Sequence, residues 1–77
     1  MNKKRRDLLK TALMYLERAR GIVNNVLDDE QDSLDNMPEN LQNSERYEAM
    51  ETAVDNLEEA VLNIEEAIEN IDEASSQ

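Results

Sequence analysis

The sequence predicts an all-α fold: an antiparallel two-helix hairpin with coiled-coil-like packing, paired into a four-helix bundle. Three observations lead to this prediction. Apolar residues recur in alternating steps of three and four in the second half of the chain, and the first half carries the same register with two positions filled by charged residues. This is the spacing of one face of a long helix. Glycine and proline occur only once each, so little interrupts a helix. The single proline lies in a polar stretch near the middle of the 77 residues, where the chain can reverse.

The chain, 1–77, is expected to form one helical-hairpin domain whose first helix covers about residues 3–35. Arg20 and Glu30 fill two positions of its apolar contact stripe, here called the seam. We interpret them as residues that set the register or lie at the edge, with packed stems and solvated charges. A contact with a partner is the alternative. The apolar seam residues of this helix are Leu9, Leu13, Leu16, Val23, Leu27, Leu34 and Met37.

A second apolar row lies outside this seam, at Leu8, Tyr15 and Ile22, which are seven residues apart. The flank between the row and the seam carries Ala12, Ala19 and Val26. A helix with one neighbour needs only a narrow apolar stripe, so the wide arc predicts more than one neighbour. A two-fold dimer of hairpins is the simplest source of the missing helices, and a partner protein is the other source.

The loop is expected over residues 36–44. Pro38 cannot continue a helix and disfavours helical geometry in the residue before it. Asn36 together with Glu39 is predicted to cap a short extra turn around the proline. Ser44 is predicted to be the N-cap of the second helix, because its hydroxyl can accept a hydrogen bond from the first turn.

The second helix is expected over about residues 45–74, where the sequence AVDNLEEAVLNIEEAIENIDEA repeats one heptad three times. Its seam consists of the a positions Val54, Val61 and Ile68 and the d positions Leu57, Ile64 and Ile71. Alanine occupies the g positions Ala53, Ala60, Ala67 and Ala74, and asparagine occupies the c positions Asn56, Asn63 and Asn70. Small residues at g predict that a neighbouring helix can approach closely, and the apolar seam residues of both helices are the predicted packing and oligomer contacts.

The net charge of −11 is unevenly distributed. Residues 1–20 carry seven bases and two acids, whereas residues 21–77 carry seventeen acids and Arg46 alone. Such a chain should avoid direct contact with nucleic acid and anionic membranes, and should attract basic protein surfaces. In a hairpin, the basic start of the first helix lies beside the acidic end of the second, which suits both helix dipoles.

Eight acids of the second helix are predicted to bind a partner: Asp55, Glu58, Glu59, Glu65, Glu66, Glu69, Asp72 and Glu73. The alternative is that they only keep the helix in solution. Residues 53–77 contain no base, and Glu69 lies four residues from both Glu65 and Glu73, so these carboxylates repel one another. Because this repulsion opposes folding, it favours a binding role.

The run KKRR at residues 3–6 is typical of a patch for nucleic acid or anionic lipid, but no aromatic residue is interleaved with it. We expect the run to neutralise the acidic end of the second helix. A further alternative is that several copies hold small anions between Lys4, Arg5 and Arg6.

The sequence lacks the residues and motifs that usually form catalytic or cofactor-binding sites. Cysteine and histidine are absent, and no glycine-rich phosphate loop occurs. The stretch DDEQDSLD at 28–35 lacks the glycine and the final glutamate of a calcium loop. No apolar run approaches the roughly 20 residues of a membrane span, and no signal peptide is recognisable. We therefore expect a cytoplasmic protein that is not an enzyme and binds no metal or cofactor.

The stretch from Asp28 to Ala74 resembles a group of very small proteins from phages, prophages and mobile elements of gut Firmicutes. The resemblance rests on an acidic pair followed by EQ-x-x-x-D-N-x-P-E-x-L-Q at 28–42, on Ser44-Glu45-Arg46 and on the repeated x-N-x-E-E-A, and it covers about two thirds of the chain. The group has no assigned activity. The resemblance implies a small accessory protein of a mobile element, many of which act by binding host proteins.

Together these patterns predict a non-enzymatic binding protein that docks its glutamate face on a basic surface of a host protein. In its most specific form it is a DNA mimic that inhibits a nucleic-acid-binding or defence protein. The alternative is a structural module that self-assembles through its apolar faces.

Overall fold

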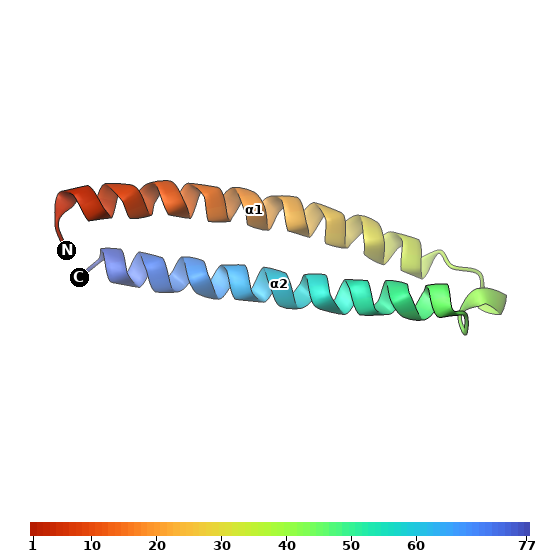
Figure 1. The fold of residues 1–77 in the computed structure, drawn as a ribbon. Coiled ribbons are helices and arrows are strands. Elements are labelled where there is room, and N and C mark those ends of the chain that lie inside the picture. The colour runs from red at the N-terminus through yellow and green to blue at the C-terminus, as the bar shows by residue number, and fades with distance from the viewer.

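The computed structural model describes all 77 residues and contains only helices. Helix α1 covers Lys3–Asp35, the 3-10 helix η1 covers Glu39–Leu41, and helix α2 covers Glu45–Ser75. The two long helices lie side by side and run in opposite directions, joined at one end by the segment that contains η1 (Figure 1). The all-helical fold with two main helices and no strand agrees with the prediction.

Side chains define where both helices begin. The Asn2 side chain accepts a hydrogen bond from the Arg5 backbone N–H at 2.9 Å. Ser44 does the same for α2, since its Oγ accepts from the Tyr47 N–H at 3.2 Å. The predicted N-cap at Ser44 is thus confirmed, whereas the cap at Asn2 was not anticipated from the sequence.

The predicted cap formed by Asn36 and Glu39 is wrong. Asn36 terminates α1, where its backbone N–H donates to the Asp32 carbonyl at 3.0 Å. The short extra turn does form as η1, but Pro38 precedes it and no side chain caps it. The reason is that Asn36 has near-helical backbone angles and is the C-cap of α1, two residues before Pro38, which is the N-cap of the new turn.

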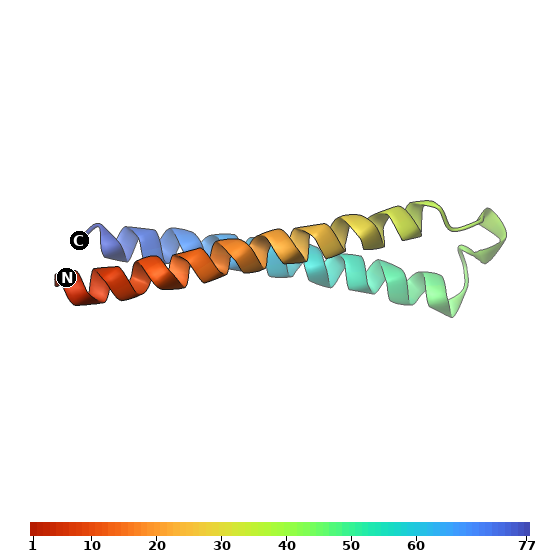
Figure 2. The same ribbon diagram turned by 90° about the horizontal axis from the view of Figure 1, so that it is seen from above.

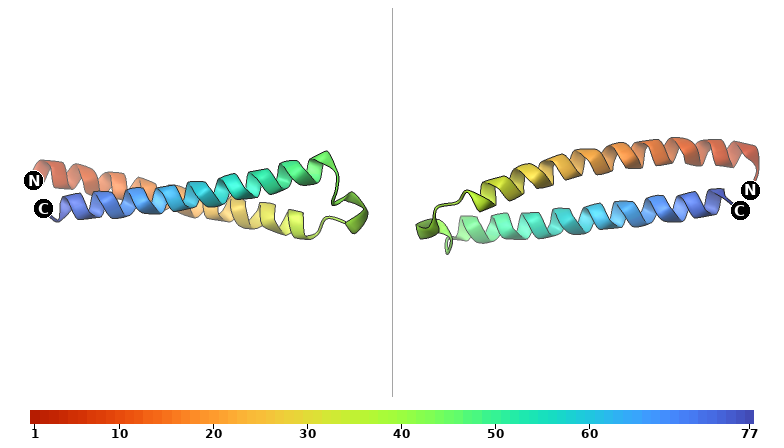
Figure 3. Two further views of the ribbon diagram at one scale, coloured as in Figure 1. Left: turned by 90° about the horizontal axis from the view of Figure 1, so that it is seen from below. Right: turned by 180° about the vertical axis from the view of Figure 1, so that it is seen from behind.

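The hairpin is long and thin, with principal extents of 59 × 14 × 13 Å. The helices cross at a shallow angle when seen from above (Figure 2), and they stay adjacent along their length when seen from behind (Figure 3). Both chain termini lie at the end opposite the loop (Figure 1). The radius of gyration is 17.4 Å, whereas a compact domain of this length would have about 11.5 Å.

Only three residues are buried, namely Leu34, Val54 and Val61. The other apolar residues of the seam are half-buried: Leu9, Leu13, Leu16, Val23, Leu27, Met37, Leu57, Ile64, Ile68 and Ile71. Arg20 and Glu30 are also half-buried, and neither forms an ion pair. Two helices therefore cover one stripe of each other but do not enclose a core.

Candidate protein-binding faces

The heptad positions divide the hairpin into two broad faces. Because the helices are antiparallel, the g flank of α1 lies beside the g flank of α2, and the e flanks lie together on the other side of the seam. In α1 the seam residues Leu13 and Leu16 occupy a and d, and in α2 Val54 and Leu57 do so. The side chains outside the seam therefore form two faces, one with positions g and c and the other with positions e and b. Position f lies along the back of each helix.

All eight acids predicted to bind a partner occupy the b, e and f positions of α2, which we call the acidic face. They are exposed, except that Glu65 is half-buried. No base from α1 pairs with them: the single ion pair in the structure joins Lys3 Nζ to Asp7 Oδ2 at 3.4 Å, one turn apart in α1. Antiparallel packing thus brings the basic start of α1 near these acids, as expected, without forming a cross-helix ion pair.

The negative charge is concentrated at the loop end of the hairpin. At the terminal end, residues 1–16 and 63–77 carry five bases and six acids, a side-chain charge of −1. The middle, residues 17–27 and 52–62, carries two bases and four acids, a charge of −2. Residues 28–51 carry nine acids and one base, a charge of −8, and we call this region the acidic pole.

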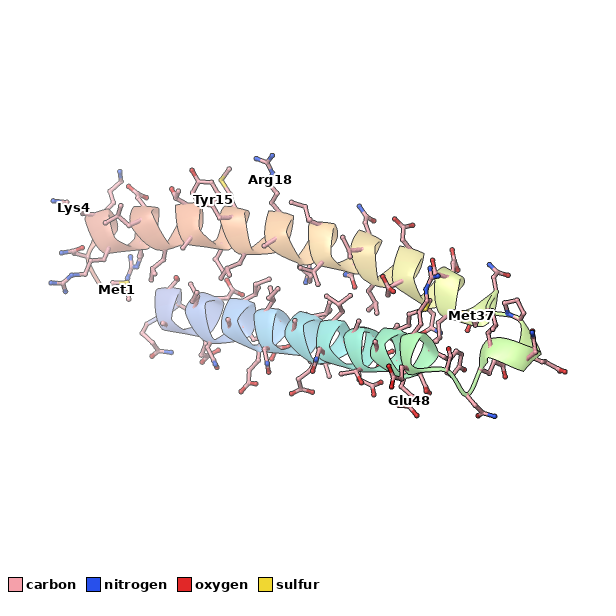
Figure 4. The ribbon with its side chains drawn as sticks, turned by 45° about the vertical axis from the view of Figure 1, so that its right-hand side comes forward. Met1, Lys4, Tyr15, Arg18, Met37 and Glu48 are labelled. Carbon is pink, nitrogen blue, oxygen red and sulfur yellow. The ribbon has the colours of Figure 1, made fainter.

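The acids of the pole come from three segments that are separate in the sequence: the end of α1, η1 and the start of α2. Glu48 projects away from α1 at this end (Figure 4). Gln31 is the only side chain that donates a hydrogen bond to one of these carboxylates, from its Nε2 to Asp35 Oδ1 at 2.9 Å. All are exposed except half-buried Glu30: Asp28, Asp29, Glu30, Asp32, Asp35, Glu39, Glu45, Glu48 and Glu51.

Sequence reasoning did not single out the acidic pole, although the run DDEQDSLD was visible. Residues 28–35 lie at the end of one predicted helix, where the helix dipole disfavours acids, and residues 45–51 lie at the start of the other, where the dipole favours them. The hairpin places both groups side by side, far from the bases of residues 3–10. The acidic pole could have been found by counting bases and acids according to their position along the predicted hairpin rather than along the chain.

The opposite face has no charge over most of its length, and we call it the neutral face. On α1 it consists of the c and g residues Leu8, Ala12, Tyr15, Ala19, Ile22 and Val26. On α2 it consists of Ala49, Ala53, Asn56, Ala60, Asn63, Ala67, Asn70 and Ala74. Charged residues of the same flank reappear only beyond its ends, at Arg5, Asp29 and Arg46.

The bases at the start of α1 do not converge on a single point. Lys4 lines one open hollow of about 550 Å³ and Arg5 lines another of about 270 Å³. The Arg6 Nη2 donates a hydrogen bond to the Gln77 carbonyl at 3.1 Å. Lys4 and Arg18 extend away from α2 (Figure 4). A single hairpin therefore offers no site at which Lys4, Arg5 and Arg6 surround one anion.

Two further features bear on the range of functions. No three acidic side chains are gathered in an arrangement that could hold a metal ion. Neither long helix contains a stretch apolar enough to cross a membrane.

No protein-family model, curated protein or solved structure matches the chain. The function is therefore argued from the two faces and the acidic pole.

Proposed function

We propose that the protein is a non-enzymatic, acidic helical binding protein that docks its acidic pole on a basic surface of another protein. The observation that carries this proposal is the net charge of −8 on residues 28–51. This region holds nine acids, nearly all exposed, and a single base. The acidic face continues the pole along α2 through Asp55, Glu58 and Glu59. Exposed charge of one sign raises the association rate with an oppositely charged surface and excludes nucleic acid and anionic lipid.

The density of charge at the pole favours the DNA-mimic form of this proposal. The paired helix ends, residues 28–35 and 45–51, carry eight acids along roughly 12 Å of helix axis. With Arg46 the net charge of these segments is −7, about one charge per 1.7 Å, which is the value for duplex DNA. A groove that binds DNA phosphates would meet a similar charge per unit length. The partner is then a nucleic-acid-binding or defence protein of the host, in keeping with the resemblance to mobile-element proteins.

The second candidate function is self-assembly, and the observation that favours it is the neutral face. The two functions are compatible, because no acid of the acidic pole belongs to the neutral face. In the combined proposal the protein acts in the cytoplasm as two hairpins paired in a four-helix bundle.

The test compares two variants that remove the same charge from different places. The pole variant carries Asp28→Asn, Asp32→Asn, Glu45→Gln and Glu48→Gln. The control variant carries Glu66→Gln, Glu69→Gln, Asp72→Asn and Glu73→Gln at the terminal end. Each is used to capture proteins from host lysate, with identification by mass spectrometry, and the captured protein is then tested against salt and duplex DNA.

We expect the wild type and the control variant to capture one basic protein that the pole variant fails to capture. Binding should weaken steeply between 50 and 300 mM salt, since exposed charges are screened over about 8–10 Å near 0.1–0.15 M. Duplex DNA should compete for the same site. Capture that is indifferent to salt and DNA, or a wild type that captures nothing beyond the pole variant, would refute the proposal.

A further inference from the structure

The neutral face exposes a continuous apolar row on α1. Tyr15 is 68% exposed, Leu8 62%, Ile22 55% and Val26 48%. Single exposed apolar residues are ordinary on protein surfaces. Here they follow one another along 19 residues of one flank, with Ala12 and Ala19 between them and the seam. A contiguous uncharged patch of this kind, bordered by charged residues, marks an interaction site.

We propose that the neutral face is the docking surface for a second copy of the chain, in a two-fold dimer whose loops lie at opposite ends. The hairpin exposes 5934 Å², whereas a compact protein of 8.9 kDa would expose about 4,800 Å². The excess of roughly 1,100 Å² is surface that a folded domain of this mass normally covers.

The size of the neutral face fits a protein–protein interface. Its α2 part extends from Ala49 to Ala74, about 37 Å of helix, and its α1 part extends from Leu8 to Val26, about 27 Å, with each helix about 10 Å wide. The resulting area of about 640 Å² approaches the ~800 Å² that each partner buries in a stable complex. Alanine along the α2 flank permits a close approach of helix axes, and asparagine at its rim supplies neutral hydrogen-bonding groups.

Because the neutral face is uncharged throughout, the partner that it fits best is another neutral face. On the neutral face itself, a basic or acidic partner would find no opposite charge, because the c and g positions from Leu8 to Val26 and from Ala49 to Ala74 are all uncharged. A second copy presents the same uncharged surface, and a two-fold interface pairs a surface with itself. Each apolar side chain of one copy then meets an apolar or small side chain of the other.

The acidic pole selects the orientation of the two copies. A two-fold axis parallel to the hairpin would place both loops at one end, so that two poles of −8 lie within about two Debye lengths of each other. An axis across the hairpin places the loops at opposite ends, and α1 then packs on α1 of the second copy. Arg5 and Asp29 lie on this flank, and each is separated from Glu17 by the same number of residues along α1. An axis near residue 17 therefore brings Arg5 of each copy to Asp29 of the other.

This dimer leaves the acidic face of each copy, and every acid of its pole except Asp29, on the outside, with the two poles at opposite ends of the bundle. It does not rest on what the pole binds, and its tests require no basic partner. Failure of the dimer would leave the docking proposal standing, and failure of the docking proposal would leave the dimer standing.

The first experiment measures the mass of the wild type by size-exclusion chromatography with light scattering. We expect twice the 8.9 kDa of one chain. Tyr15→Glu and Ile22→Glu each place a charge on the neutral face and should yield the monomer, with helical circular dichroism retained because both side chains are exposed. The matched controls are Met14→Glu and Leu62→Glu, which add the same charge at exposed apolar residues on the other side, 70% and 59% exposed. They should remain dimeric.

The second experiment measures the orientation and stays informative if a glutamate variant fails to fold. Because the chain has no cysteine, Asn40→Cys in η1 supplies a single site for a nitroxide spin label at the loop tip. If the loops lie at opposite ends, the two labels should be about 65 Å apart. Each loop tip lies roughly 22 residues of helix rise from the centre of the neutral face, and the distance between the labels is twice that length. A distance below about 30 Å, a monomeric wild type, or dissociation by Leu62→Glu as readily as by Tyr15→Glu would overturn the proposal.

Discussion

Val54→Ala should destabilise the hairpin far more than a larger deletion next to the seam. Val54 is 3% exposed, the lowest exposure in the molecule, and it lies in the α1–α2 contact. Removing its two methyl groups forfeits about 1.6 kcal/mol of transfer free energy at ~0.8 kcal/mol per carbon. An unfilled cavity adds up to about 1 kcal/mol, and the higher helix propensity of alanine returns roughly 0.5 kcal/mol. The expected loss in the free energy of unfolding is about 1.5–2 kcal/mol.

Leu62→Ala is the matched control, because it removes three carbons from the same helix. Leu62 is already 59% exposed, so its deletion should cost less than about 1 kcal/mol. Both variants are unfolded in urea at the same protein concentration and followed by circular dichroism at the helix band. With a urea slope near 1 kcal/mol per molar, Val54→Ala should lower the midpoint by roughly 1.5 M. Equal losses in the two variants, or a larger loss for Leu62→Ala, would refute the assignment of the seam.

Two further predictions concern local energetics. Ser44→Ala removes the hydroxyl that accepts from the Tyr47 N–H and should lower the free energy of unfolding by about 1 kcal/mol, whereas Ser44→Asn should retain most of it. Urea unfolding of both variants measures the difference, and equal losses of stability would contradict the cap. Glu69→Lys replaces two like-charge contacts, with Glu65 and Glu73 one turn away, by two attractive ones and should raise stability by roughly 0.5–1 kcal/mol at low salt. The gain should shrink at 1 M salt, and a gain that is unchanged there would show that it is not electrostatic.

The helices and the loop could be predicted because local rules determine them. The three-and-four spacing of apolar residues, the single proline and the Ser44 cap act within a few residues of one another. The Asn36 cap was predicted wrongly because Asn36 is the C-cap of α1, and η1 begins two residues later than a cap at Asn36 requires. Local sequence ranks the candidates for a helix end but does not choose between neighbouring residues.

The acidic pole could not be read from the chain because it depends on the pairing of distant segments. The candidate acids of α2 were chosen for the absence of bases within residues 53–77. The hairpin places residues 3–10, with most of the bases, beside the last of those acids. The acids with the fewest bases near them are instead those of residues 28–51, nine acids with Arg46 alone, which sequence order divides between two helices and a loop.

The repeated heptad of α2 assigns each of its positions to one surface. Positions a and d contact α1, positions g and c are alanine and asparagine, and positions b, e and f hold all eight acids from Asp55 to Glu73. A hairpin selected only for stability and solubility would mix lysine with glutamate, since oppositely charged residues four apart support a helix and like charges weaken it. It would also gain nothing from keeping charge off the g and c flank for 25 residues. Both features are explained if the flank must meet another uncharged surface while the acids remain free to meet a basic one.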